Sequence, residues 1–176
     1  MQIGDVPRIK TPRLTLREWR AADAEAYAAL AADPEVTHYI GGVMSREQSW
    51  RSMALHAGHW TLRGYGHWAV VRTADGQFLG RAGLWSPEAS GWPGLEVGWT
   101  FARHAWGHGY ATEAGGAAMR WAWTVLKAAR LISVIHPENT ASVQVARRLG
   151  LAFLRAAELS GQIVSVFGIE RPTDVV

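Results

Sequence analysis

Two glycines separated by one residue, Gly107 and Gly109, lie in a short loop between an apolar strand pattern and an Ala-rich helix pattern. Glycine accepts positive φ angles and has no side chain, so the N–H groups of such a loop can converge on one point. The N-terminus of the following helix adds unpaired donors and a partial positive charge. This spacing predicts an anion site suited to a diphosphate, and a plain glycine turn before a helix is the alternative.

Two better-known phosphate motifs are excluded. The loop lacks the Gly-Lys-Ser/Thr of a P-loop and the third glycine of a dinucleotide-binding turn, and it follows a late strand. Small residues after the loop are expected to let the helix lie close to a sheet, and Trp121, Ala122 and Val125 continue its apolar face. Glu113, in the first helical turn, is expected to complement the helix dipole.

The elements that must position this loop follow from hydrophobic periodicity and end signals. Ser45 and Gln48 form a capping-box pattern, and Asp75-Gly76 predicts a hairpin turn. Predicted strands span residues 13–19, 68–71, 78–85, 95–101, 131–135, 152–159 and 163–170; predicted helices span 21–32, 45–62, 110–127 and 139–149. The order βααβββαβαββ predicts an α/β fold around a mixed sheet.

Composition limits the number of domains and the classes of protein and site that the chain can represent. The 176 residues fit one domain over residues 1–176, with residues 1–10 expected to be a flexible N-terminal segment. No long apolar run, no signal-peptide layout and no Cys are present, which predicts a cytoplasmic protein without a membrane partner. The net charge is +3 with Arg scattered among acids, which argues against a nucleic-acid partner. His56 and His59, with His67 nearby, lack a convincing further ligand, so no metal is predicted.

Two longer motifs carry a resemblance. Residues 106–114 read WGHGYATEA and residues 137–151 read PENTASVQVARRLGL, and shorter motifs agree in order at residues 11–17, 66–71, 80–84 and 95–99. In this combination the chain resembles the GNAT superfamily of N-acetyltransferases over nearly its whole length. More narrowly it is similar to the Rim-type branch, which includes ribosomal-protein N-terminal acetyltransferases. The resemblance implies a mixed, mostly antiparallel sheet, flanked by helices and splayed into a V between its fourth and fifth strands.

The resemblance also implies that acetyl-CoA lies in the V. The backbone of Trp99, Thr100 and Phe101 is then expected to pair with the pantetheine arm. Asn139 is expected to cap its helix and to bond a pantetheine amide. The residues expected around the diphosphate are His104, Trp106, Gly107, His108, Gly109, Tyr110, Ala111 and Thr112, with His104 standing where the superfamily pattern has Gln or Arg.

Amine acetylation needs a base, oxyanion donors and an acid for the departing thiolate. The absence of Cys excludes an acyl-cysteine intermediate, so direct attack in a ternary complex is expected. Many superfamily members use a Tyr where this chain has Ala146, and the Rim-type resemblance implies Ser142 as the acid instead; helix capping is the alternative role. Glu96, out of phase with Val97 and Trp99, is expected to be the base or to form a surface salt bridge.

The resulting hypothesis is an N-acetyltransferase that moves an acetyl group from acetyl-CoA to a primary amine. That amine belongs either to a protein N-terminus or to a small molecule. A non-catalytic acyl-CoA-binding or sensory module of the same fold is the alternative, and a homodimer is left open. Most Trp residues are expected in the core, and the candidates for the acceptor groove are Trp60, Trp68, Trp85 and Trp92.

Overall fold

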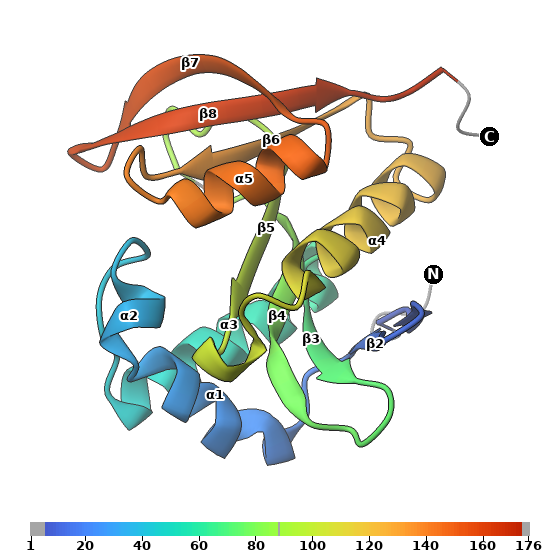
Figure 1. Ribbon diagram of the computed structural model, residues 1–176, viewed down its shortest axis with the longest axis vertical. Helices are drawn as coiled ribbons and strands as arrows, with labels where there is room; N and C mark the ends of the chain where they lie inside the picture. Colours follow the sequence, from blue (N-terminus) through green and yellow to red (C-terminus); the bar gives the residue numbers. More distant parts are fainter. Residues whose placement is uncertain (1–5, 88, 174–176) are drawn as a thin grey trace.

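The computed structural model describes residues 6–87 and 89–173. Within them, eight strands form one sheet in the order β1-β2-β3-β4-β5-β6-β8-β7 (Figure 1). The strands are β1 (Ile9–Lys10), β2 (Leu14–Arg17), β3 (His67–Arg72), β4 (Phe78–Trp85), β5 (Glu96–Phe101), β6 (Arg130–Ile135), β7 (Ala152–Leu159) and β8 (Gln162–Glu170). The helices are α1 (Ala24–Ala31), α2 (Pro34–Thr37), α3 (Arg46–Arg63), α4 (Tyr110–Thr124) and α5 (Thr140–Arg148). Single 3-10 turns precede α1 and α4 at Ala21–Asp23 and Arg103–Ala105.

The sheet opens between β5 and β6. Every other neighbouring pair of strands is antiparallel, whereas β5 and β6 are parallel and pair only at Glu96 and Ile132. Beyond that point the two strands diverge, and Figure 1 shows β5 leaving the upper strands β6–β8 toward the lower half of the molecule. The predicted mixed, mostly antiparallel sheet that splays into a V is therefore confirmed. The family's fourth and fifth strands are β5 and β6 here because β1 adds one strand at the start.

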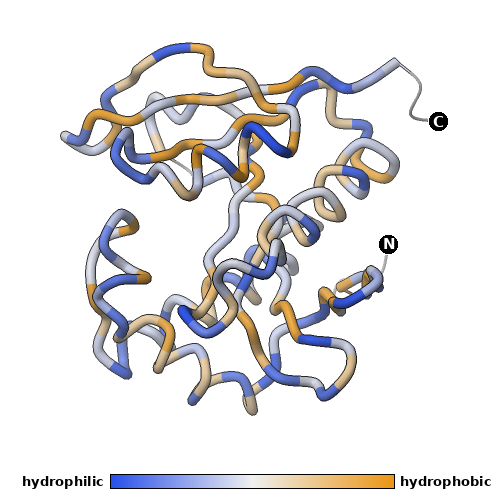
Figure 2. The backbone as a smooth tube through the Cα atoms, in the orientation of Figure 1, coloured by the Kyte–Doolittle hydropathy of each residue, from blue (hydrophilic) through white to orange (hydrophobic). Residues whose placement is uncertain are grey.

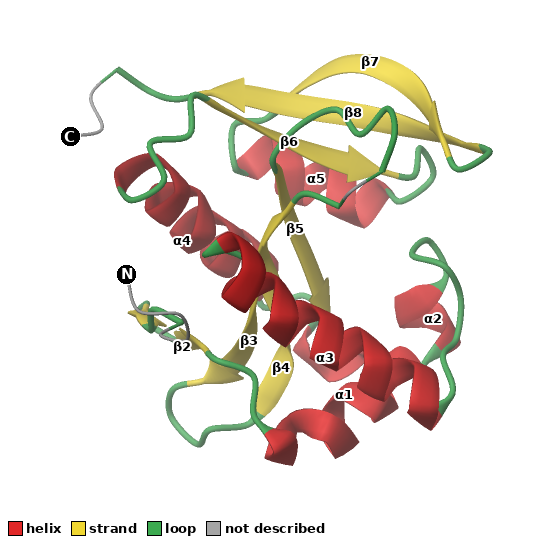
Figure 3. Cartoon of the chain, turned by 180° about the vertical axis from the view of Figure 1, so that it is seen from behind, coloured by secondary structure: helices red, strands yellow, loops and turns green. Residues whose placement is uncertain are grey.

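Helices cover both faces of the sheet. The small residues Ala114, Ala117 and Ala118 of α4 are buried in the main core, where they bring the helix close to the sheet. Gly115 lets the end of α5 approach α4, because a Cβ there would lie 2.9 Å from Cδ1 of Leu149, the C-cap residue of α5. In Figure 3, α3 crosses in front of β3 and β4 on the opposite face from α4. Hydrophobic and hydrophilic positions alternate along α5 (Figure 2), as expected of a helix with one packed face.

The structure corrects three sequence predictions. Part of the segment expected to be flexible over residues 1–10 is ordered, because Ile9–Lys10 pair with β2; residues 1–5 lie outside the described residues. A short helix, α2, follows Asp33, whose side chain accepts the N–H of Glu35 and so caps it. Finally, α4 ends at Thr124, and Val125 is 56% exposed instead of continuing the apolar face.

Candidate functional site

A cleft of about 400 Å³ lies where β5 and β6 diverge. It is bordered by these two strands, by α3, by the start of α5 and by the loop after α2. Five of the predicted catalytic and cofactor-binding residues line it together: Glu96, Trp99, Thr100, Asn139 and Ser142. The two predicted catalytic side chains, which stand 46 positions apart on different elements, therefore face the same space.

One edge of β5 is open in the cleft. Residues 96–101 all pair with β4 on one side. On its other side, β5 pairs with the described residues only at its start, where the Ile132 N–H donates to the Leu95 carbonyl at 2.9 Å. Apart from the Phe101 carbonyl, which accepts from the Trp106 indole, the N–H and C=O groups on that edge can pair with an extended chain that carries amides. Trp99, Thr100 and Phe101, predicted to pair with a pantetheine arm, lie on this stretch.

The loop of residues 104–112, termed here the glycine loop, presents unpaired donors. Gly107 and Gly109 have φ angles of 78° and 76°, which favour glycine. Among the described residues, no acceptor faces the backbone N–H of any residue from 107 to 112. A Cβ on Gly107 would meet no atom within 4 Å, so the space beside this residue is open. Such a cradle at a helix N-terminus fits a diphosphate, as the sequence predicts.

An arginine from the other end of the chain holds the glycine loop. Arg13 donates from Nε to Glu113 Oε2 at 2.7 Å and from Nη1 to the His108 carbonyl at 2.8 Å. Glu113 Oε1 also accepts from the Thr11 hydroxyl at 2.6 Å and from the Arg13 N–H at 2.9 Å. Burial raises the pKa of Glu113, but these bonds from Thr11 and Arg13 outweigh it, so its pKa lies below the ordinary value. Glu113 is thus a structural anchor as well as a first-turn acid.

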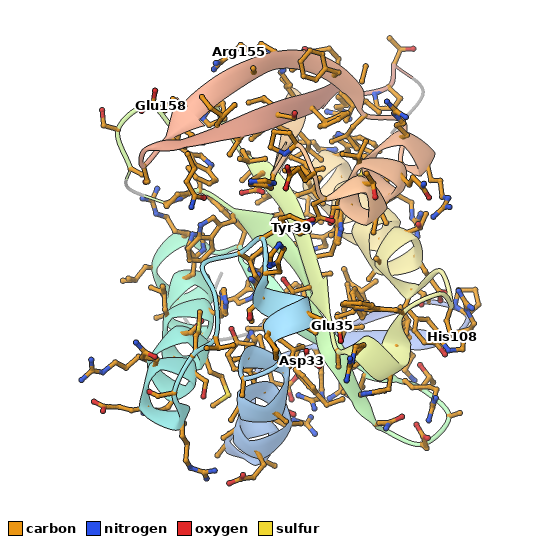
Figure 4. The ribbon with its side chains drawn as sticks, turned by 60° about the vertical axis from the view of Figure 1, so that its left-hand side comes forward. Asp33, Glu35, Tyr39, His108, Arg155 and Glu158 are labelled. Carbon is orange, nitrogen blue, oxygen red and sulfur yellow. The ribbon has the colours of Figure 1, made fainter. Side chains whose placement is uncertain are left out.

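Aromatic side chains shape the rest of the glycine loop. Trp106 donates from Nε1 to the Phe101 carbonyl at 2.8 Å, which folds the loop back on the end of β5. The His108 ring stacks on Tyr110 with centroids 5.4 Å apart. His104, at the start of the glycine loop, is exposed and belongs to the 3-10 turn Arg103–Ala105. Figure 4 shows His108 at the outer rim of the molecule, beside the start of α4.

Glu96 sits at the point where β5 and β6 part. Its Oε1 accepts the N–H of Val134 at 3.2 Å, a donor that a continuous sheet would pair with β5 backbone. Burial raises the pKa of Glu96 to about 7, against the opposing effects of the Val134 N–H and the Arg81 charge. The ion pairs of the described residues do not include Glu96. The alternative of a surface salt bridge is therefore wrong, and the carboxyl can exchange a proton near neutral pH.

Asn139 and Ser142 divide the two roles that the sequence left open. Asn139 Oδ1 accepts the Ser142 N–H at 3.1 Å, so Asn139 is the N-cap of α5, as predicted. The Ser142 hydroxyl forms no hydrogen bond with the described residues, and Ser142 lines the cleft. The capping alternative for Ser142 is therefore wrong. A free hydroxyl at this position can donate to a group inside the cleft.

A polar cluster borders the cleft on the β3–β4 side; its His residues stand out in the sequence, whereas Arg81 does not. His67 on β3 and Arg81 on β4 lie next to His56 of α3, and all three line the cleft. His67 stands next to the fully buried Trp68, and Arg81 next to the fully buried Ala82. A polar residue in such a position is the sequence signal that could have identified these two residues. No group of residues suited to a metal ion occurs in the described part of the chain, and the metal reading of the His residues gains no support.

Aromatic residues complete the cleft wall. Trp85 and Trp92 line it, whereas Trp60 and Trp68 are buried in the core. Tyr39, from the loop after α2, stacks on His136 after β6 with centroids 4.9 Å apart. This contact joins the two arms of the V on one side, and Figure 4 shows Tyr39 between α2 and the upper strands.

Comparison with known proteins agrees with this architecture. The family model described as acetyltransferase (GNAT) domain matches residues 13–152. The uncharacterized protein YkkB of Bacillus subtilis strain 168 is 28% identical over 166 residues, which span 91% of this chain and 94% of YkkB. A crystal structure of an acetyltransferase from Agrobacterium tumefaciens strain C58 superposes with a TM-score of 0.84 at 29% identity, covering 94% of this chain and 95% of that one.

A second similar structure was solved with coenzyme A. It is RimL, described as a ribosomal L7/L12 alpha-N-protein acetyltransferase, and it superposes with a TM-score of 0.78 over 96% of this chain and all of that one. Its identity to this chain is 17%, so the likeness extends to the fold alone. No helix within residues 6–87 and 89–173 has the length and apolar character needed to cross a bilayer.

Proposed function

The chain belongs to the GNAT acetyltransferase family, and from this premise we propose that it is an N-acetyltransferase that moves an acetyl group from acetyl-CoA to a primary amine. One observation carries the proposal. A proton acceptor with a pKa of about 7, Glu96, and an unbonded hydroxyl, Ser142, line the same cleft. The strand that borders this cleft, β5, has an open edge and leads into the loop with the unpaired N–H groups, whose residues do not themselves line the cleft. Each of these features matches one requirement of acetyl transfer from a thioester to an amine.

The proposed contacts to acetyl-CoA fall into two groups. The open edge of β5, at Trp99, Thr100 and Phe101, pairs with the pantetheine amides, and Asn139 bonds one of them with its side-chain N–H groups. The glycine loop binds the diphosphate through backbone donors, and the residues we assign to it are His104, Trp106, Gly107, His108, Gly109, Tyr110, Ala111 and Thr112. The unpaired N–H groups of residues 107–112 support this assignment.

In the proposed mechanism acetyl-CoA supplies the acetyl thioester, and this chain supplies the proton transfers. Glu96 accepts a proton from the amine, so that the nitrogen lone pair is free to attack the carbonyl carbon. Backbone N–H groups near Trp99 on the open edge of β5 stabilise the developing oxyanion. Ser142 then donates a proton to the departing sulfur. A C–N bond forms and a C–S bond breaks, with no covalent intermediate on the protein.

We propose a protein N-terminus or a small-molecule amine as the acceptor, and we keep the Rim-type assignment as a proposal that rests on the residue motifs. Tyr39, Trp85, Trp92 and His136 give the acceptor side of the cleft an aromatic wall. Among its described residues Glu96 is the one carboxylate, so a polycationic acceptor finds little compensation there. A single domain over the whole chain, a cytoplasmic location and a homodimer stay predictions.

Release of free thiol from acetyl-CoA tests the proposal. The full chain is mixed with acetyl-CoA and with aromatic amines, polyamines or short peptides, and the thiol is titrated with a chromogenic disulfide. Thiol release that depends on the amine, with acetylated amine seen by mass spectrometry, is the expected result. Tight CoA binding without release for any amine would instead favour the acyl-CoA-binding or sensory module. Absence of CoA binding would exclude both the acetyltransferase and the acyl-CoA-binding module.

A further inference from the structure

Arg81 brings a positive charge into the cleft without an acidic partner. It lines the cleft from β4, and the ion pairs of the described residues do not include it. Arg46 and Arg51 on the exposed side of α3, by contrast, each pair with a Glu. Glu96 is the one carboxylate among the described cleft residues, and burial raises its pKa to about 7, so it balances the guanidinium only in part at neutral pH. Arg81 can therefore pair with an anion that enters the cleft.

The guanidinium of Arg81 uses few of its hydrogen-bond donors. Its Nη1 lies 2.7 Å from Nδ1 of His67 and 3.5 Å from Nε2 of the same ring, and this ring offers no negative charge. Its Nε is buried without a hydrogen-bond partner, and none of the described residues accepts a bond from Nη2. An arginine has five N–H donors, and buried donors are nearly always paired in folded proteins. The unused donors indicate that a ligand completes this site.

Thr100 adds a second free donor directly opposite Arg81. The two residues are register partners on the antiparallel strands β4 and β5, so their side chains lie on the same face of the sheet. Both line the cleft, and the Thr100 hydroxyl forms no hydrogen bond with the described residues. A hydroxyl and a guanidinium side by side fit the two oxygens of a carboxylate, and such charge-assisted bonds are stronger than those between neutral groups.

Short contacts lead from these donors to Glu96, the proposed proton acceptor. The Nη1 of Arg81 lies 3.5 Å from His67 Nε2. A Cβ placed on Gly98 would lie 3.2 Å from His67 Nε2 and 3.9 Å from Glu96 Oε1, and Gly98, without a side chain, leaves this space open to the cleft. The guanidinium and the carboxyl therefore cannot be farther apart than these three distances placed end to end. Hydrogen bonds of about 3 Å at either end leave room for an amine and a carboxylate a few bonds apart, as in an α-amino acid.

Apolar side chains line the cleft beside these polar groups. Three of them are the aromatic residues Tyr39, Trp85 and Trp92, and Ile40 and Leu55 line it as well. Ile40 is 41% exposed and Leu55 57% exposed, although both are large apolar side chains. An apolar group of a bound molecule would cover such surface, an arrangement typical of small-molecule sites. The cleft therefore suits a molecule that joins an amine, a carboxylate and an apolar group.

We propose that Arg81 and Thr100 bind a carboxylate of the acceptor, so that the substrate is a free amino acid with an apolar side chain. Its carboxylate pairs with Arg81, its amine faces Glu96, and its side chain packs on the aromatic wall of the cleft. A protein N-terminus is then a poor acceptor, because its first residue carries a neutral amide in place of the carboxylate. This inference rests on the proposed function, because it assumes that an amine is acetylated in this cleft.

Pairs of amines that differ only in the carboxylate test this assignment. L-phenylalanine is compared with phenethylamine, L-leucine with 3-methylbutylamine and L-tryptophan with tryptamine, each as acceptor for the full chain with saturating acetyl-CoA. In each pair that supports thiol release we expect kcat/KM to be about a hundredfold higher for the amino acid, because its analogue leaves the donors of Arg81 unpaired. L-phenylalaninamide, which has the neutral amide of a peptide, should be as poor an acceptor as phenethylamine. Equal use of amino acids and simple amines would overturn the proposal.

Substitution of Arg81 gives a readout that a merely structural role would not move. Arg81→Met should raise the KM for L-phenylalanine about a hundredfold and bring its kcat/KM to about that of phenethylamine. An indirect effect of the lost charge on Glu96 would act on both amines and cancel in the ratio of their kcat/KM values. Arg81→Lys keeps a cation and should retain part of the preference, whereas Arg51→Met, on the exposed face of α3, should retain all of it. An unchanged ratio in folded Arg81→Met would count against the assignment.

Binding of 3-phenylpropionate separates this inference from the proposed function. This acid has the carboxylate and the ring but no amine, so calorimetry with the CoA-bound full chain measures the site without acetyl transfer. We expect its Kd to be at least about tenfold lower than that of 3-phenylpropanamide, its neutral counterpart, and to rise to the level of the amide in Arg81→Met. If no amine supports thiol release, the proposed function fails, whether or not the acid binds.

The present inference fails alone under a different result. Amines would then be acetylated regardless of a carboxylate, and the acid would bind no better than the amide. Circular dichroism and a CoA titration establish that each variant is folded. If Arg81→Met does not fold, the substrate ratios of the wild type and its comparison of acid with amide decide.

Discussion

Arg13 and Glu113, one hundred positions apart, form an ion pair in which Nε and Nη2 both contact Glu113 Oε2, and this pair ties the start of β2 to the first turn of α4. The same guanidinium accepts no bond and donates to the His108 carbonyl, so it also holds the glycine loop. Because Arg13 takes up this carbonyl, the loop is fixed in a conformation that leaves its N–H groups unpaired. The contact therefore prepares the loop for an anion before the anion arrives.

Removing this contact should weaken CoA binding more than it destabilises the fold. In Arg13→Ala the loop loses two anchors, and we expect the Kd for CoA to rise about tenfold, equivalent to about 1.4 kcal/mol. The side chain of Arg13 is half exposed, so the change in the free energy of unfolding should stay below about 1 kcal/mol. Isothermal titration calorimetry and thermal unfolding measure the two effects. Arg51→Ala is the control, and an unchanged CoA affinity in Arg13→Ala would show that the loop does not need this anchor.

Gly107→Ala should damage the glycine loop in a way that a comparable glycine elsewhere does not reproduce. The φ of 78° makes an Ala unfavourable by about 1 kcal/mol, and because the new Cβ would meet no other atom, the strain falls on the loop backbone that carries the N–H groups. Gly76→Ala is the matched control, because Gly76 has a φ of 73°, has equally free surroundings and lies in the β3–β4 turn. Both variants should lose similar stability. Only Gly107→Ala should lose CoA affinity; equal affinities for CoA in the two variants would contradict the diphosphate assignment.

Much of this molecule was predictable because its signals are local. The capping box at Ser45 and Gln48 and the left-handed Gly64 set the ends of α3, and both are visible as residue types. The Asn139 cap of α5 and the turn at Gly76 are equally local, as is the glycine pair at Gly107 and Gly109. Glu96 was recognised as an outlier because its phase differs from that of its apolar neighbours on the strand.

The remainder depends on contacts between distant segments, which periodicity does not encode. Nothing near Arg13 in the sequence indicates that its partner is Glu113. The sequence does not predict the short helix α2, because Asp33-Pro34 directly follows the predicted helix 21–32 and indicates its end, although Pro at a first helical position also begins a helix. His67 and Arg81 gain their meaning only when β3 and β4 lie side by side, because their contact is across strands.

Ser142→Ala should separate catalysis from helix capping. The Ser142 hydroxyl has no partner among the described residues, so its loss should leave the melting temperature and the CoA affinity near those of the wild type. We expect kcat to fall about a hundredfold, the size of a general-acid contribution. Asn139→Ala, which removes the cap itself, should instead cost about 1 kcal/mol of stability. A destabilised Ser142→Ala with normal kcat would return Ser142 to a purely structural role.

The raised pKa of Glu96 makes two opposite pH predictions, one for activity and one for stability. Glu96 must be ionised to accept a proton. We therefore expect kcat/KM to rise with pH, with a midpoint at about pH 7, and to level off above it. Glu96→Gln, which retains an acceptor for the Val134 N–H, should lose most of the activity along with this acid limb. Glu47→Gln on the exposed side of α3 should keep both.

Stability should move the other way. In the unfolded chain Glu96 ionises near its ordinary pKa of 4.5, whereas the folded chain keeps its proton up to about 7. The folded state therefore binds more protons between these values, and the contribution of Glu96 to stability falls as pH rises from 4.5 to 7, by up to about 3 kcal/mol, then stays level. Since Gln does not ionise, Glu96→Gln should become more stable than the wild type above pH 7 and lose this slope. Urea unfolding at several pH values measures it, and parallel pH profiles for the two proteins would mean that the carboxyl of Glu96 is ionised at an ordinary pKa and that burial in the cleft does not tune it.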